Sequence, residues 1–414
     1  MREEVNQKIE HSSEPHYAWV MVTIGFVIVG MEFGALVTIS VFLKPLVQEL
    51  NWSRGDTSFA YTVGAIASGV GGIVMGWIAD RFSTRPVVLF GGVLMGLSLF
   101  LLSNVKTIWQ LYLYYGVMGV GFGAMTVPIV SNVGQWFNRN KGLALGITSA
   151  GGTFGQALVP SFARFIITFS SWRESFTILA LVFWIVLIPL SLLAKTPPSL
   201  SKNNRLASLE SSPISAPVFP IAPAKLISWL SVAVIFCCIC MATPIIHVVA
   251  LATDKGIDSQ VAAGVLSAIM IAGLFGRIMF GKIADHIGGL RAYFLASLLQ
   301  TVFVFWFSRL HTTATFYILA VLFGLGYSGV MTCVWVCVRE MIPPKSGGLA
   351  LGITSLFAMI GMGLGGYQGG FFFDLTGNYT FSFANAALAG VANLMIVGSL
   401  VLYAKRKQEV LLAT

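Results

Sequence analysis

Twelve long apolar segments alternate with short polar breaks along the chain. Within each segment apolar residues cover every side of a helix, whereas a membrane-barrel strand would alternate apolar and polar residues. A helix needs about 20 apolar residues to cross the roughly 30 Å hydrocarbon core of a bilayer. The pattern therefore predicts twelve membrane-spanning helices, near residues 17–43, 57–79, 87–104, 108–134, 142–168, 173–194, 226–250, 260–281, 290–309, 314–338, 347–371 and 382–404.

Composition agrees with this all-α membrane fold. Hydrophobic residues make up 56% of the 414 residues and charged residues only 10%, and the mean hydropathy is +0.84. An average soluble domain is about one-quarter charged. The composition therefore excludes a water-soluble fold of this size.

The net charge of +9 raises the question of nucleic acid, but its distribution indicates a membrane. Of the 25 Lys and Arg residues, seventeen lie on the predicted side of both termini and six on the other side. The remaining two, Arg164 and Arg277, fall inside predicted spans. Since basic residues concentrate in cytoplasmic loops, we expect a multi-pass protein of the cell membrane with both termini in the cytoplasm, and no nucleic-acid partner.

All five cysteines lie inside predicted spans, and Cys237 and Cys240 form a C-x-x-C pair. A redox or metal site would need a neighbouring strand, a histidine ligand or a polar loop, and none accompanies this pair. Small buried packing residues are the better interpretation. We expect no metal site and no cofactor.

Two motifs recur at nearly the same offset, which indicates an internal duplication. GLALGITS at residues 142–149 returns unchanged at 348–355, an offset of 206. Gly76-x3-Asp80 returns as Gly281-x3-Asp285, an offset of 205. Residues 1–195 and 225–414 are therefore expected to form two six-helix bundles related by pseudo-symmetry, the second with a short cytoplasmic tail.

The segment between the copies, residues 196–224, contains six of the fifteen prolines and no apolar span. Such a composition is typical of a flexible linker, here on the cytoplasmic side. Two bundles joined in this way can rock against each other. That motion is what alternating access requires, with the solute near the membrane midplane between the bundles.

The loop after the second predicted helix, Gly76-x3-Asp80-Arg81-x3-Arg85, resembles the signature of the major facilitator superfamily. Ser83 and Thr84 replace the usual glycine and first basic residue, and the second copy has His286 where the first has Arg81. The resemblance implies a cytoplasmic charge network that pairs in one conformation and separates in another. Its candidate members are Asp80, Arg81, Arg85, Asp285 and Arg139.

Within that superfamily the chain looks like the branch of monocarboxylate transporters and oxalate/formate exchangers. Three places carry the resemblance: residues 15–20 at the start of the first helix, residues 136–146 before the fifth, and the loops at 171–176 and 374–379. The resemblance implies a secondary active transporter of a small lactate-like or pyruvate-like monocarboxylate, coupled to a proton. The alternatives are an oxalate/formate-type anion exchanger and a facilitator that exports an unrelated compound.

Ionisable side chains in mid-span are costly, about 2.5–3.5 kcal/mol on insertion scales, so each is a candidate functional residue. Arg277 occupies the position in the eighth helix where monocarboxylate transporters keep a substrate-binding arginine. A guanidinium suits that role because its planar fork matches a carboxylate. The repeat aligns Arg277 with Gly72, so the shared fold does not demand the charge. The competing interpretation is a cytoplasmic gate residue.

Glu32 and His247 are the candidates for proton coupling. Glu32 lies well inside the first span, where a carboxylate in a low-dielectric cavity could take and release a proton, or could simply be paired with a backbone group or with Arg277. His247 could titrate, but a lone helix histidine is more often packed and hydrogen-bonded. Both alternatives stay open at this point.

Three departures from the branch affect the expected mechanism. Proton-coupled members usually have a lysine in the first helix and an aspartate four residues before the arginine, and this chain has Val37 and Gly273 there. Oxalate exchangers add a lysine in the eleventh helix, and residues 347–371 contain none. A single cation suits a monoanion, because a second carboxylate would be buried without a partner.

Two further classes of function fit less well. A membrane sensor would normally carry a soluble signalling domain, and we expect none on the short tails. An enzyme would need a nucleotide loop, nucleophile motif or metal cluster, and the glycine patterns are helix-packing runs instead. We expect a transporter that works as a monomer in the bilayer and carries a small organic anion, either together with a proton or in exchange for another anion.

Overall fold

Long helices form all the regular structure in the computed structural model, which describes residues 16–137, 141–195, 221–342 and 344–413. The first half contains α2 (His16–Val37), α3 (Ile39–Leu50), α4 (Arg54–Arg81), α5 (Thr84–Leu102), α6 (Ile108–Trp136), α7 (Lys141–Phe169) and α8 (Trp172–Leu193). The second half contains α10 (Pro223–Asp254), α11 (Ser259–Ile287), α12 (Gly289–Val304), the 3-10 helix η1 (Phe305–Arg309), α13 (Thr313–Met341), α14 (Pro344–Thr376) and α15 (Thr380–Ala413).

These helices account for the twelve predicted spans, with α2 and α3 forming the first and α12 and η1 forming the ninth. Among the described residues, eleven helical segments are long and apolar enough to cross a membrane. The helix α7 is not one of them, although it is 29 residues long. Gln156, Arg164 and several glycines lower its hydropathy, so the fifth span depends on its packing between other helices.

The first predicted span is one segment in the sequence but two helices in the structure. Thr38 lies between α2 and α3 with helical backbone angles, and both its N–H and its hydroxyl donate to the carbonyl oxygen of Ala35, at 3.1 and 2.6 Å. Pro45 lies inside α3 and has no backbone N–H to donate to the preceding turn. The tighter turn at Thr38 marks the boundary between α2 and α3, and α3 extends the segment seven residues beyond the predicted end, to Leu50.

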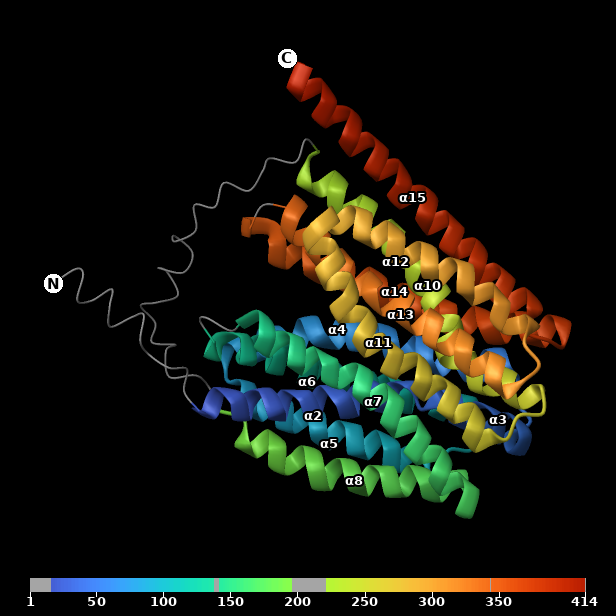
Figure 1. Ribbon diagram of the computed structural model, residues 1–414. Coiled ribbons are helices and arrows are strands. Elements are labelled where there is room, and N and C mark those ends of the chain that lie inside the picture. The colour runs from blue at the N-terminus through green and yellow to red at the C-terminus, as the bar shows by residue number, and fades with distance from the viewer. Residues whose placement is uncertain (1–15, 138–140, 196–220, 343, 414) are drawn as a thin grey trace.

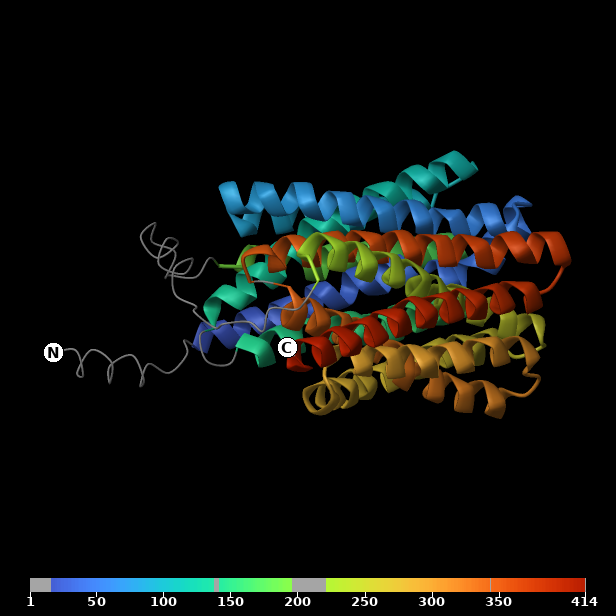
Figure 2. The ribbon, with the colours of Figure 1, turned by 90° about the horizontal axis from the view of Figure 1, so that it is seen from above.

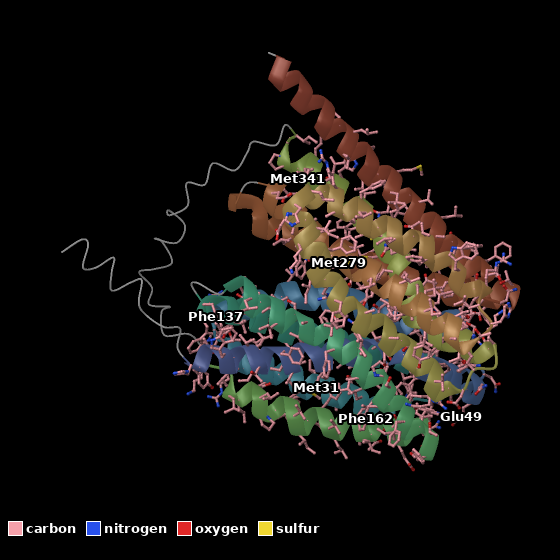
Figure 3. The ribbon with its side chains drawn as sticks, viewed as in Figure 1. Met31, Glu49, Phe137, Phe162, Met279 and Met341 are labelled. Atoms are coloured by element: carbon pink, nitrogen blue, oxygen red, sulfur yellow. The ribbon has the colours of Figure 1, made fainter. Side chains whose placement is uncertain are left out.

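We call the end of the molecule where α8 ends and α10 begins the linker end, and the opposite end the far end. Glu49 marks the far end and Phe137 the linker end in Figure 3. Far-end connections are short, and five helices begin there with a side chain that accepts a hydrogen bond from a first-turn N–H. These capping residues are Ser53, Thr107, Ser171, Asp258 and Thr312.

The two halves have the same internal packing, as the repeat predicts. In the first half α2 packs against α7, α4 against α6, and α5 against α8. In the second half α10 packs against α14, α11 against α13, and α12 against α15. The helices lie roughly along one common direction (Figures 1 and 2). The fold is therefore two pseudo-symmetric six-helix bundles.

Two seams join the halves, one where α4 packs against α14 and the other where α7 packs against α11. A smaller contact between α3 and α10 lies at the far end. The halves converge at the far end and diverge toward the linker end (Figure 1). Every hydrogen bond and ion pair between the halves in the described residues lies on a seam or at the far end. The conformation is closed at the far end.

Glycines set the closest helix approach inside the first half. Gly155 on α7 faces the backbone of Gly30 on α2, and a Cβ at Gly155 would overlap the Gly30 carbonyl oxygen. Gly151, one turn earlier, meets the backbone of Phe26 in the same way. Small residues at four-residue spacing let two membrane helices touch along their backbones. This contact holds α7 in position beside α11.

Candidate functional site

Arg277 lies on the α7/α11 seam, where the two halves meet. It is half-buried, about 15 Å along α11 from the helix end at Ile287, taking roughly 1.5 Å per residue. Its Nη1 donates to the carbonyl oxygen of Ser149 on α7 at 3.4 Å, a long hydrogen bond. Its Nε is buried without a hydrogen-bond partner. No acidic side chain pairs with this guanidinium among the described residues.

The position of the missing aspartate, Gly273, is enclosed by α13. A Cβ there would meet Ser328 Cβ and the Tyr327 hydroxyl, each at 3.2 Å. Ser328 donates to the Gly273 carbonyl oxygen at 2.7 Å, which keeps the two helices close. The Tyr327 hydroxyl donates to Met270 Sδ at 2.9 Å. A tyrosine thus fills the space one turn from Arg277, and no acid neutralises the arginine from its own helix.

Glu32 on α2 is fully buried, with 0% of its surface exposed. Its Oε1 accepts a hydrogen bond from the Thr126 hydroxyl on α6. Its Oε2 has no partner among the described residues. An ionised carboxylate buried with one free oxygen would be strongly disfavoured, so the arrangement suits a group that carries a proton. The contact with Thr126 was not expected from the sequence.

The two buried charged positions belong to different halves. His16 of α2 and Ile287 of α11 both lie at the linker end. At roughly 1.5 Å per residue, Glu32 lies about 24 Å along α2 from His16, and Arg277 lies about 15 Å along α11 from Ile287. Figure 3 labels Met31 and Met279, their sequence neighbours, on the two bundles. No hydrogen bond or ion pair between Glu32 and Arg277 is found, so the predicted alternative of a direct pair is not formed in this conformation.

The α7/α11 seam carries further polar contacts toward the far end. Ser161 and Ser267 share a hydrogen bond of 2.7 Å, and Ser267 also donates to the carbonyl oxygen of Ala157 at 2.7 Å. Arg164 lies still nearer the far end, with a buried Nε that has no partner. This seam is hydrogen-bonded across the halves at several levels, and the polar residues that form these contacts lower the hydropathy of α7.

His247 lies near the far end of α10 and is fully buried. Its Nε2 lies 2.7 Å from the Gly366 carbonyl oxygen and its Nδ1 lies 3.2 Å from the Tyr379 hydroxyl. Both ring nitrogens therefore have partners. Proton coupling by His247 stays a prediction, and its surroundings are those of a packed, hydrogen-bonded side chain.

Three members of the predicted linker-end charge network have described side chains in this conformation. Arg81, Arg85 and Asp285 are exposed and form no ion pair with another described residue. The Arg81 guanidinium instead lies over the Trp77 ring, 5.6 Å from its centroid. Asp80 lies within α4, and Arg139 lies outside the described residues. The network stays a prediction for a conformation in which the linker ends approach.

The sequence did not predict a charged cluster at the far end. Arg54 at the start of α4 pairs with Asp254 at the end of α10, and Lys44 on α3 reaches the same carboxylate at 2.8 Å. Asp374 on α14 accepts from the backbone N–H groups of Arg54 and Gly55. The only signal was the motif at residues 374–379, which was noted for its resemblance and not for a role.

Matches to known proteins agree with this architecture. The family model of the Major Facilitator Superfamily matches residues 22–366 and 228–412. The chain belongs to the major facilitator superfamily.

In the described part of the chain no three His, Cys, Asp or Glu side chains gather in a way that could hold a metal ion.

Relatives within the superfamily are membrane transporters. Monocarboxylate transporter 2 of Homo sapiens is 24% identical over 430 residues, which cover 95% of this chain and 88% of that protein. Monocarboxylate transporter 13 of Rattus norvegicus is 26% identical over 389 residues, covering 91% and 88%. The agnestins efflux protein of Paecilomyces divaricatus is 24% identical over 288 residues, covering 69% and 64%. These relatives are transporters, not enzymes.

Solved transporters of the superfamily share the fold. A nucleoside transporter superposes with a TM-score of 0.73 at 13% identity, covering 92% of this chain and 99% of that structure. A D-xylose-proton symporter gives a TM-score of 0.71 at 15% identity, covering 91% and 96%. The solved structures show the fold, and the family match together with the apolar helices makes this facilitator a multi-pass membrane transporter.

Proposed function

We propose that this facilitator carries a small monocarboxylate, of the lactate or pyruvate kind, by alternating access, with Arg277 as the residue that binds the carboxylate. One observation carries the proposal: the Arg277 guanidinium lies between the halves with a single long hydrogen bond and no acidic partner in the described residues. A half-buried guanidinium inside a membrane span, with its Nε unpaired and no counter-ion, is unfavourable. A carboxylate that bound its fork would supply both the charge and the missing hydrogen bonds.

The single negative charge of the proposed cargo follows from the surroundings of Arg277. Besides Arg277, the other arginine inside a span, Arg164, lies far along the seam toward the opposite end. A dianion would therefore leave one carboxylate without a partner in an apolar region. The relatives named monocarboxylate transporters support the same substrate class.

Glu32 is the proposed proton carrier. Its Oε2 is buried with no hydrogen-bond partner, and Glu32 forms no ion pair with any described residue, so the protonated form is the one that this environment favours. The lysine that proton-coupled members usually have in the first helix is absent, because that position is Val37. A proton on Glu32 and an anion on Arg277 would together cross the membrane as a neutral load, which lowers the cost of closing the bundle around them.

We also propose that the linker end is cytoplasmic, on the distribution of basic residues, and that the membrane is the cell membrane. This conformation would then open toward the cytoplasm. The charge network of Asp80, Arg81, Arg85, Asp285 and Arg139 would assemble when the linker end closes.

Efflux of an unrelated small compound is the second candidate. The relative named as an agnestins efflux protein favours it, although that match covers only 69% of this chain. Export of an uncharged compound would have no use for the Arg277 guanidinium. The two candidates therefore differ in what they require of this residue.

Uptake of labelled lactate and pyruvate into proteoliposomes tests the proposal. We expect saturable uptake that an inward proton gradient accelerates and that unlabelled monocarboxylates inhibit. Oxalate should inhibit weakly. Absence of uptake and of counterflow under every pH gradient, from protein that is folded by size-exclusion chromatography, would remove the monocarboxylate proposal and favour the efflux candidate.

A further inference from the structure

Arg54 is the point where most of the far-end contacts between the halves meet. It begins α4 in the first half, and its side chain is only 11% exposed. Its guanidinium binds both carboxylate oxygens of Asp254 on α10, at 2.5 and 3.0 Å. The same guanidinium lies 3.7 Å above the Phe373 ring of α14. A bidentate pair that is largely shielded from water is much stronger than an exposed one.

Asp374 holds the backbone at the same helix start. Its Oδ1 accepts from the Arg54 N–H at 2.9 Å, and its Oδ2 accepts from the Gly55 N–H at 2.6 Å. These N–H groups belong to the first turn of α4, which has no intrahelical acceptors for them and carries a partial positive charge. The carboxylate comes from the other half, so one half of the molecule caps a helix of the other.

A hydrogen-bond chain extends from Arg54 into the second half. Arg54 Nη1 donates to the Tyr379 hydroxyl at 3.0 Å, and that hydroxyl lies 3.2 Å from His247 Nδ1. Because His247 Nε2 has only the Gly366 carbonyl to bind, it must donate there, which leaves Nδ1 of a neutral ring to accept from Tyr379. His247 is thus a positioning residue that orients the Tyr379 hydroxyl toward Arg54.

We propose that Arg54, Asp254, Asp374 and Tyr379 form the far-end gate of this transporter, and that they separate each time the far end opens. Arg54 supplies most of the contribution of α4, through its side chain to Asp254 and Tyr379 and through its backbone to Asp374, and the Gly55 N–H adds a second bond to Asp374. The gate can reopen because all its charged groups lie at helix ends near the membrane surface, where water replaces the lost partners. The proposal rests on the alternating access of the proposed function but holds for any cargo, so failure of lactate uptake would not overturn it.

Distances between spin labels at Lys106 and Lys255 test the gate in the full-length protein. Both side chains are exposed at the far end, one on each half, and the five native cysteines are buried, so labels attach to introduced cysteines. The unsubstituted gate should give mainly one short distance. Arg54→Gln and Asp374→Ala should each raise the ratio of long to short distances by about 10-fold or more, as expected for losing charge-assisted hydrogen bonds.

Arg173→Gln is the matched control. Arg173 pairs with Glu49 at the same end, but both residues belong to the first half, so breaking this pair should leave the distances unchanged. If Arg54→Gln is not folded by size-exclusion chromatography, Tyr379→Phe takes its place, because it removes only the hydroxyl. The proposal is overturned if either folded gate variant has the distance distribution of Arg173→Gln.

Discussion

Arg277 of the second half and Ser149 of the first half meet across the α7/α11 seam, where Nη1 of the arginine donates to the serine carbonyl oxygen at 3.4 Å. A hydrogen bond of this length is weak, so it orients the guanidinium without satisfying it. The backbone carbonyl also brings no charge. The arginine therefore keeps most of its donors and its full charge for an anion that enters between the halves.

Glu32→Gln should separate proton coupling from transport. Glutamine keeps an oxygen that can accept the hydrogen bond from Thr126, so the bundle should remain folded. The glutamine side chain cannot ionise, so it cannot carry the coupled proton. We expect that an inward proton gradient no longer accelerates lactate uptake, whereas exchange of labelled for unlabelled lactate at equal pH continues. Initial rates at several gradients measure the first, and counterflow measures the second.

Thr126→Val provides the matched control for that experiment, since it removes the hydroxyl next to Glu32 and leaves the carboxyl group. Proton-driven uptake should persist in Thr126→Val, although its pH dependence can move. If Glu32→Gln retains the full response to the gradient, the proton is carried elsewhere and the role proposed for Glu32 is wrong.

His247→Leu should lower stability and leave the response to proton gradients in place. Leucine removes both hydrogen bonds, so the buried Gly366 carbonyl and the Tyr379 hydroxyl lose partners, at about 1–3 kcal/mol for each group left unsatisfied. We expect a lower melting temperature in detergent and a more open far end. Loss of gradient-driven uptake with normal counterflow would instead identify His247 as the coupling residue.

Gly155→Ala should destabilise the first half, and Gly146→Ala, on the same helix, should not. A Cβ at Gly155 overlaps the Gly30 backbone, whereas nothing lies within 4 Å of a Cβ at Gly146. Overpacking of this kind costs about 1–3 kcal/mol, and alanine in a helix is favoured over glycine by about 0.5–1 kcal/mol. Thermal unfolding of both variants in one detergent measures the difference. Equal melting temperatures would contradict the close α2/α7 contact.

The sequence predicted the fold well because a membrane leaves few alternatives for an apolar chain. The twelve predicted spans correspond to helices in the structure, eleven of them apolar enough to cross a membrane among the described residues, and the repeat of GLALGITS placed α7 and α14 in equivalent positions. Local breaks were less visible. Thr38 looks like an ordinary mid-span residue, and the tighter turn that it makes with Ala35 between α2 and α3 has no pattern in the sequence.

The site was predictable only where a single residue carried the signal. Arg277 and Glu32 stood out because charge inside a span is rare. The far-end cluster did not stand out, because Arg54, Asp254 and Asp374 each sit at a helix end, where charged residues are common and need no partner. Only the approach of the two halves brings them together, across 320 positions of sequence in the case of Arg54 and Asp374.

Binding of lactate to the purified protein, measured by calorimetry for wild type, Arg277→Lys and Arg164→Lys, tests the central claim most directly. Lysine keeps the charge but loses the planar fork, so Arg277→Lys should bind about 10-fold to 100-fold more weakly, as expected for lost charge-assisted hydrogen bonds. Arg164→Lys should bind like wild type. Equal affinity of Arg277→Lys and wild type for lactate would contradict the assignment of Arg277 as the carboxylate-binding residue.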